Sequence, residues 1–136
     1  MKTRASAYVL AIDEGRVLLT QLAASCWNGG HWTLPGGGID HGEQPMQTVV
    51  REAHEETSLA VNDLRLFHAR TFSEDGKQGP FLALQVVYTG VMRGEPRVLE
   101  QGGSTAAVRW IPLGEVASLP TVALVDEVLS MWHQRG

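Results

Sequence analysis

Residues 26–38 read CWNGGHWTLPGGG, a run that breaks the regular pattern of the segments around it. Its glycines and its proline impose turns and leave backbone N–H and C=O groups without covering side chains. Such a run in the middle of a chain allows another group to approach the backbone closely. We therefore treat residues 26–38 as a boundary between structural elements and as part of a candidate site.

Segments rich in β-forming residues lie on both sides of this run. The turn residues Asp13-Glu14-Gly15 separate the first two segments and predict a hairpin. The polar stretch 73–80 is predicted to be a loop. Strands are predicted over 7–12, 16–22, 64–72, 81–91 and 107–111.

Two segments have helical spacing of apolar residues. One runs from about Pro45 to Thr57. The other follows Pro120, with Thr121 as its expected N-cap. Its apolar positions are Val122, Val125, Val128, Leu129 and Trp132. Two helices with about six to eight strands predict an α/β fold with a mixed, largely antiparallel sheet.

Composition limits the classes of function. A length of 136 residues predicts a single domain over residues 1–136. The 43% of apolar residues and the formal net charge of -4 are typical of a globular protein. Without a cluster of Lys and Arg, no nucleic-acid polymer is expected as a partner. Formation of a homodimer is left open by the sequence.

The first residues resemble a short signal peptide, because Lys2 and Arg4 precede an apolar run. The acidic turn that ends the run carries no small-residue cleavage site. No segment approaches the ~18 apolar residues of a membrane span. The single cysteine, Cys26, is expected to be a buried small residue, and it cannot form an internal disulfide. We therefore expect a cytoplasmic protein with no membrane partner.

The helix over 45–57 carries the chemistry. Its apolar residues Met46, Val49, Val50 and Ala53 form one stripe that is expected to pack on the core. The acidic face beside it is expected to look outward, with Thr48 above it. This face consists of Glu52, Glu55 and Glu56. Three carboxylates at this spacing repel one another, and a hard divalent cation such as Mg²⁺ or Mn²⁺ would relieve the repulsion.

Residues 37–59, GGIDHGEQPMQTVVREAHEETSL, resemble the box of the Nudix hydrolase family. That box is a glycine, five residues, a glutamate, seven residues, and then Arg-Glu-apolar-x-Glu-Glu-x-Gly-apolar. Ser58 replaces the last glycine. Matching residues are Gly37, Glu43, Arg51, Glu52, Ala53, Glu55, Glu56 and Leu59. The upstream WTLPGG and the downstream RWIPLGEV are also similar to Nudix segments.

The resemblance implies an α/β/α sandwich that holds a loop–helix–loop metal site. Glu52, Glu55 and Glu56 would bind Mg²⁺, with Mn²⁺ as a substitute, together with a backbone carbonyl of Gly36 or Gly37. The implied reaction is water attack at phosphorus on a nucleoside diphosphate linked to another moiety. Such substrates include a (d)NTP, an oxidised dNTP, ADP-ribose and a nucleotide sugar.

Other residues would support this site. Arg51 is expected to brace a box glutamate, either Glu52 or Glu43, by a charge-assisted hydrogen bond. Glu43 supports the start of the helix. We predict Glu52 as the general base, and Glu100 is a second candidate for base or metal ligand. Ser58 would have to adopt a left-handed backbone, at a cost of about 1–2 kcal/mol.

Two rival functions remain. A Nudix-like domain that senses a nucleotide without cleaving it would be expected to lose some of its acidic residues. An isomerase of isoprenoid diphosphates would need a catalytic cysteine, and Cys26 in a short chain is poor support for one. The histidines are expected to be solvated or packed; contact with phosphates is the alternative for His31 and His41, which lie near the glycine-rich turn. The aromatic residues are expected to fill the core, and none is assigned to base stacking. They are Trp27, Trp32, Phe72, Phe81 and Tyr88.

Overall fold

The computed structural model describes residues 2–76 and 79–135. Its first sheet has the strand order β5-β1-β7-β6. Strand β1 pairs in parallel with β7 and antiparallel with β5, and β6 pairs antiparallel with β7. The strands are β1 (Lys2–Leu10), β5 (Gly36–Gly38), β6 (Asn62–Gly76) and β7 (Gly79–Val91).

The second sheet is antiparallel throughout. Its central strand β3 pairs with β2, β4 and β8. The strands are β2 (Ile12–Asp13), β3 (Arg16–Leu22), β4 (Trp32–Thr33) and β8 (Thr105–Pro112). A 3₁₀ helix, Leu113–Ser118, follows β8. The expected α/β class and the mixed, largely antiparallel pairing are confirmed.

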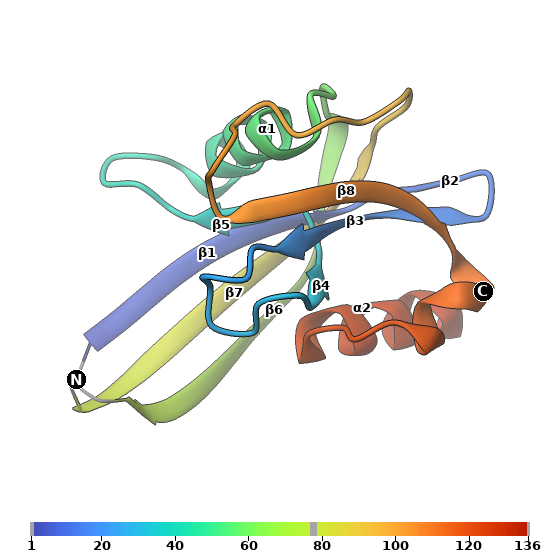
Figure 1. Ribbon diagram of the computed structural model, residues 1–136. Helices are drawn as coiled ribbons and strands as arrows, with labels where there is room; N and C mark the ends of the chain where they lie inside the picture. Colours follow the sequence, from blue (N-terminus) through green and yellow to red (C-terminus); the bar gives the residue numbers. More distant parts are fainter. Residues whose placement is uncertain (1, 77–78, 136) are drawn as a thin grey trace.

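The sheets lie between two helices, α1 (Pro45–Thr57) and α2 (Ala123–Gln134) (Figure 1). Alternate residues of one strand point to opposite faces. In β3, Leu18 packs in the cluster under α1, whereas Val17 and Leu19 pack in the cluster under α2. Because both faces of the central strands are buried, the sheets form the middle layer and α1 is fixed against β1, β5 and β8.

The predicted hairpin over 7–12 and 16–22 is wrong for most of its length. Only Ile12 and Asp13 pair with β3, opposite Val17 and Arg16. The chain crosses between the sheets at Ala11, and β1 joins β5 and β7 instead. Parallel pairing with β7, about eighty residues later, is a long-range contact that short-range turn chemistry does not report.

The predicted loop over 73–80 is also wrong. Strand β6 continues to Gly76 and β7 starts at Gly79, so Ser73 pairs with Leu82 and Asp75 with Pro80. Residues 77–78 of that prediction lie outside the described part of the chain. Polar side chains do not prevent pairing here, because the backbone forms the ladder and the side chains stay in solvent.

Helix α1 has the predicted bounds, but a different face is buried. Val49 and Ala53 are fully buried, whereas Met46 and Val50 are about half exposed. Thr48 and Glu56 are buried as well, so the acidic face does not look outward as a whole. The buried stripe follows positions 49, 53, 56 and 57, because the packed core rather than hydropathy alone sets the helix rotation.

The start of α2 differs by one residue from the prediction. The N-cap is Val122, without a side-chain capping bond. Thr121 Oγ1 instead donates to Asp126 Oδ1 at 2.7 Å. Among the described residues, no helix is long and apolar enough to span a membrane.

Candidate active site

The glycine-rich turn passes close to α1 and to β1. A Cβ on Gly36 would lie 2.2 Å from the carbonyl oxygen of Ala7, and its φ of +149° is disfavoured for other residues. A Cβ on Gly37 would lie 2.9 Å from the carboxyl carbon of Glu52. The absence of side chains at 36 and 37 therefore lets the backbone approach the acidic residues of α1.

Arg51 organises the start of the site. Its Nε and Nη2 donate to the two oxygens of Glu43 at 2.8 and 2.9 Å, and its Nη1 donates to Glu52 Oε1 at 2.9 Å. Asp40 Oδ2 lies 3.3 Å from Nη2. The expected bracing of Glu43 or Glu52 thus applies to both, and one guanidinium fixes both carboxylates.

Glu43 is an acceptor for three groups. In addition to Arg51, Thr48 Oγ1 donates to it at 2.6 Å and the Asp40 N–H at 3.1 Å. These bonds, that from Arg51 first, lower the pKa of Glu43 to about 2. Thr48 was expected only to lie above the acidic face. Its bond to Glu43 links the first turn of α1 to the segment before the helix, and it was not predictable from spacing.

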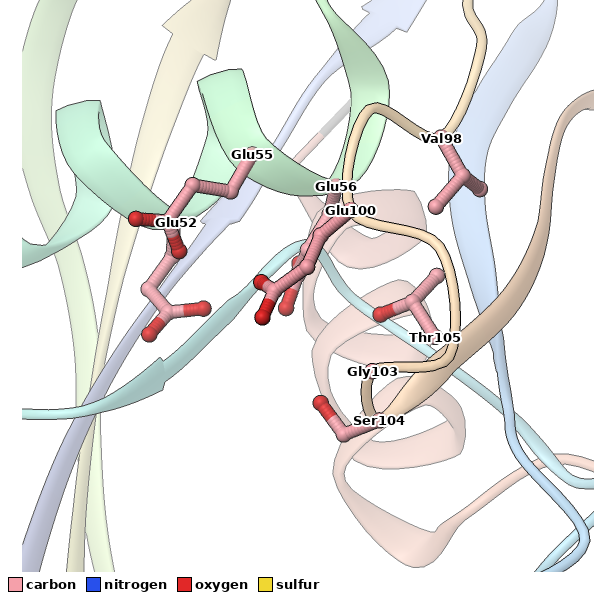
Figure 2. A pocket seen from close by; sticks show the side chains of 8 residues that line it. All are labelled: Glu52, Glu55, Glu56, Val98, Glu100, Gly103, Ser104 and Thr105. Carbon is pink, nitrogen blue, oxygen red and sulfur yellow. The ribbon is translucent and has the colours of Figure 1, made fainter.

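Four glutamates line one pocket between α1 and the loop that precedes β8 (Figure 2). Glu52, Glu55 and Glu56 come from α1, and Glu100 comes from the loop. The cavity volume is about 20 Å³. That volume matches a water-sized species. The pocket is completed by Val98, Gly103, Ser104 and Thr105, which the sequence did not indicate.

Burial and repulsion favour the neutral forms of two of these groups. Glu56 is only 8% exposed, and burial raises its pKa well above the usual value although the Gly36 N–H donates to Oε1 at 3.0 Å. Nearby Glu52 and Glu55 raise it further. Burial, followed by Glu52, also raises the pKa of Glu55. A bound cation would reverse this preference by stabilising the ionised carboxylates.

Backbone hydrogen bonds bring Glu100 to α1. The N–H groups of Arg97 and Leu99 donate to the carbonyls of Thr57 and Glu55 at 2.9 and 3.2 Å. These carbonyls belong to the last turn of α1, which has no helical partners for them. Trp110 Nε1 donates a hydrogen bond of 2.8 Å to Gly94 O, which fixes the start of the same loop. Glu100 therefore reaches the pocket 44 residues after Glu56 in the chain.

The residues present fit a hard divalent ion. The lining offers carboxylate oxygens in a water-sized space, which is the donor chemistry that Mg²⁺ and Mn²⁺ accept. In the described part of the chain, no three His, Cys, Asp or Glu side chains are close enough to enclose an ion by themselves. Mg²⁺ usually keeps several waters, so an incomplete protein shell suits it better than a full cage.

Ser58 adopts the conformation expected of the missing glycine. Its φ is 67°, in the left-handed region, and its N–H donates to His54 O at 2.9 Å. The helix thus ends where the glycine form would end it. Two other expectations fail: Cys26 is only partly buried, and Trp27 is 76% exposed. His31 and His41 do not line the carboxylate pocket.

Comparisons with known proteins identify the family and the fold neighbours of this chain. The family model described as NUDIX domain matches residues 2–132. A Mycobacterium tuberculosis protein provisionally named 8-oxo-dGTP diphosphatase 3 is 34% identical over 106 residues, which are 76% of this chain and 48% of that protein. The chain thus spans about half the length of this relative.

Solved structures show the same fold. The MutT NUDIX hydrolase from Burkholderia pseudomallei has a TM-score of 0.81 and 26% identity, covering 96% of this chain and 98% of the other. The NUDIX domain of Shewanella oneidensis NrtR, complexed with ADP ribose, has a TM-score of 0.79 and 24% identity, covering 99% and 88%. With Glu52, Glu55 and Glu56 of the box in one pocket and the domain model spanning residues 2–132, the chain belongs to the NUDIX family.

Proposed function

We propose that residues 1–136 form one catalytic domain, a Mg²⁺-dependent pyrophosphohydrolase. Its substrate would be a nucleoside diphosphate linked to another moiety. The observation that supports this most is the pocket that combines Glu52, Glu55 and Glu56 with Glu100. The relatives' names, 8-oxo-dGTP diphosphatase and NUDIX hydrolase, point to the same chemistry. Oxidised and ordinary (d)NTPs are therefore the first substrates to test.

Glu52, Glu55 and Glu56 would hold the ion, with a backbone carbonyl of Gly36 or Gly37. When bound, the ion would neutralise charge on the phosphates and lower the pKa of a water. Glu52 would take the proton from the attacking water, while the bond from Arg51 Nη1 to its Oε1 fixes its orientation. Arg51 and Glu43 would act by positioning.

Glu100 is the second candidate for the base or for an additional ligand. Its side chain is exposed at the pocket and comes from a loop instead of the helix. Gly103 lies against it, since a Cβ there would be 3.2 Å from the carboxyl carbon. A side chain at position 103 would therefore crowd the Glu100 carboxylate.

The test is release of nucleoside monophosphate or phosphate from a substrate panel, with and without Mg²⁺ or Mn²⁺. The panel contains (d)NTPs, 8-oxo-dGTP, ADP-ribose, dinucleoside polyphosphates and nucleotide sugars. Turnover by the native chain and its loss in Glu55→Gln/Glu56→Gln would support the proposal. Glu52→Gln and Glu100→Gln, compared at saturating metal, distinguish the two candidate bases.

Metal-dependent binding without turnover on any panel member would contradict catalysis. It would favour a domain that senses a nucleotide, in line with the ADP-ribose complex of the Shewanella NUDIX domain. Gln47→Ala is a matched control on α1, because Gln47 lies in the first helical turn and only caps the helix through the Gln44 N–H. It should lower stability without removing the metal dependence.

A further inference from the structure

Trp27 is the most exposed large apolar residue in the described part of the chain, with 76% of its surface in contact with solvent. Exposure of a tryptophan loses the favourable burial of a large aromatic surface, so an exposed one is informative. The four other aromatic residues that were expected to fill the core do pack against other residues. Trp32 and Tyr88 are buried, and the rings of Phe72 and Phe81 pack on each other at 6.2 Å.

The loop that carries Trp27 is built by its own hydrogen bonds. The Gly29 N–H donates to Cys26 O and the His31 N–H to Asn28 O, at 2.9 and 3.0 Å. Asn28, directly after Trp27, has a left-handed φ of 64°. Gln21 Nε2 donates to Gly30 O at 3.1 Å and ties the loop to β3. Trp27 is therefore held in solvent by an ordered turn.

This loop lies against the carboxylate pocket. The Ala23 N–H donates to Ser104 O at 2.8 Å, and Cys26 Sγ lies 3.6 Å from the same oxygen. Ser104 lines the pocket together with Glu56 and Glu100. In Figure 1 the loop between β3 and β4 lies beside the start of β8, as these bonds require. Trp27 is thus the next residue after Cys26, whose sulfur contacts Ser104 in the lining of the pocket.

We propose that Trp27 is a binding residue that stacks on the aromatic base of the substrate while the phosphates lie at the carboxylate pocket. The inference rests on the proposed function and assigns the residue that binds the base that all these substrates share. Every nucleobase has a π face, so stacking favours a base over no base without selecting one base. Phe72 and Phe81 are less suited, because they lie toward the end of β6 and the start of β7, away from the loop that borders the pocket (Figure 1).

Binding is tested by tryptophan fluorescence of the full chain in Mg²⁺, because the cation is what would hold phosphates at the carboxylates. The probes are AMP and dGMP, which have no phosphoric anhydride bond to hydrolyse, with ribose 5-phosphate and inorganic phosphate as baseless controls. We expect the nucleotides to quench emission and the baseless probes to leave it unchanged. Trp27→Phe should remove the quenching, whereas Trp132→Phe, on the far helix α2, should retain it.

Kinetics supply the second measurement. Trp27→Ala should raise KM for nucleotide substrates by about tenfold, the effect expected from loss of one stacked base, and leave kcat within about threefold. Trp27→Phe should restore most of the affinity. Trp27→Leu, which keeps apolar bulk without an aromatic ring, should resemble Trp27→Ala. The melting temperature should change little in all three, because the side chain is exposed.

The outcomes separate this inference from the proposed function. Turnover with an unchanged KM in Trp27→Ala, or equal quenching by ribose 5-phosphate, would overturn the role of Trp27 and leave the hydrolase proposal intact. Base-dependent quenching without turnover would support Trp27 and contradict the hydrolase. Emission that changes with protein concentration, together with a doubled molecular mass, would assign Trp27 to self-association and also overturn the inference.

Discussion

Arg51 and Glu43 are joined by two parallel contacts, Nε to Oε2 at 2.8 Å and Nη2 to Oε1 at 2.9 Å. Bidentate geometry of this kind fixes the plane of both groups. Because the same guanidinium also bonds Glu52, the start of the α1 segment and a proposed metal ligand share one anchor. The site is therefore sensitive to changes at a residue that need not touch substrate.

The first prediction concerns acid stability. The folded pKa of Glu43 is about 2, below the ordinary value of 4.5. Its ionised form therefore stabilises the fold above pH 4.5, and this contribution is lost as the pH falls from 4.5 to 2. The difference in melting temperature between the native chain and Glu43→Gln should be largest near pH 6 and should vanish toward pH 2. Thermal unfolding followed by circular dichroism measures it.

The matched control is Glu14→Gln. Glu14 is exposed and meets Arg16 only at 3.8 Å, so the difference from the native chain should stay small at every pH. A constant difference for Glu43→Gln from pH 6 to pH 2 would contradict an ionised Glu43 held by Arg51.

The second prediction is that Glu56→Gln stabilises the protein without metal and removes its response to metal. The folded pKa of Glu56 is raised, so near pH 8 its ionised form is destabilising, and neutral Gln keeps an acceptor for the Gly36 N–H. We expect a rise in melting temperature of about 4 °C in EDTA, equivalent to about 1 kcal/mol. Mg²⁺ should then raise it no further.

Differential scanning calorimetry with EDTA and with Mg²⁺ makes this measurement. Glu55→Gln is the comparison, because the Glu55 side chain is 41% exposed and should gain less stability. If Glu56→Gln melts below the native chain in EDTA, buried repulsion at Glu56 is not the dominant effect.

The third prediction is that Ser58→Gly raises the melting temperature. Ser58 has a φ of 67°, which costs a residue with a side chain about 1–2 kcal/mol relative to glycine. Part of the gain is offset because glycine is more flexible when unfolded, which leaves about 1 kcal/mol. Metal dependence should stay the same, because the left-handed helix end is already formed.

Ser130→Gly is the control, and it should lower the melting temperature. Ser130 is exposed within α2, where glycine is less favourable than serine by about 0.5 kcal/mol. Equal effects of both glycine substitutions on the melting temperature would show that backbone strain at Ser58 has no measurable cost.

The fourth prediction concerns the glycine turn. A Cβ at Gly37 would meet the Glu52 carboxyl group at 2.9 Å, the end of a flexible side chain. Gly37→Ala should therefore fold but displace Glu52, lowering kcat by at least about tenfold, which is 1.36 kcal/mol in the barrier. Steady-state kinetics at saturating metal tests this. Gly38→Ala meets no atom within 4 Å and should keep near-native activity. Equal kcat values for the two variants would show that a side chain at position 37 does not disturb the role of Glu52.

Local sequence determined much of this protein. The bounds of α1, the spacing that places Glu52, Glu55 and Glu56 on adjacent positions of that helix, and the left-handed end at Ser58 follow from periodicity and from the box. These features depend on contacts within a few residues, where the 100° rotation per helical residue controls which side chains are neighbours. The sequence also predicted that Arg51 braces a glutamate of the box, but it left open whether the partner is Glu43 or Glu52.

Tertiary structure decided the rest. The pairing of β1 with β7 and the burial of Glu56 depend on how the sheets and α1 pack together. Glu100 reaches the pocket because backbone N–H groups of its loop satisfy the open carbonyls at the end of α1, and any residue except proline can supply such a donor. Side-chain identity carries no record of these backbone contacts, so the sequence could name Glu100 as a candidate base or ligand without predicting how it reaches α1.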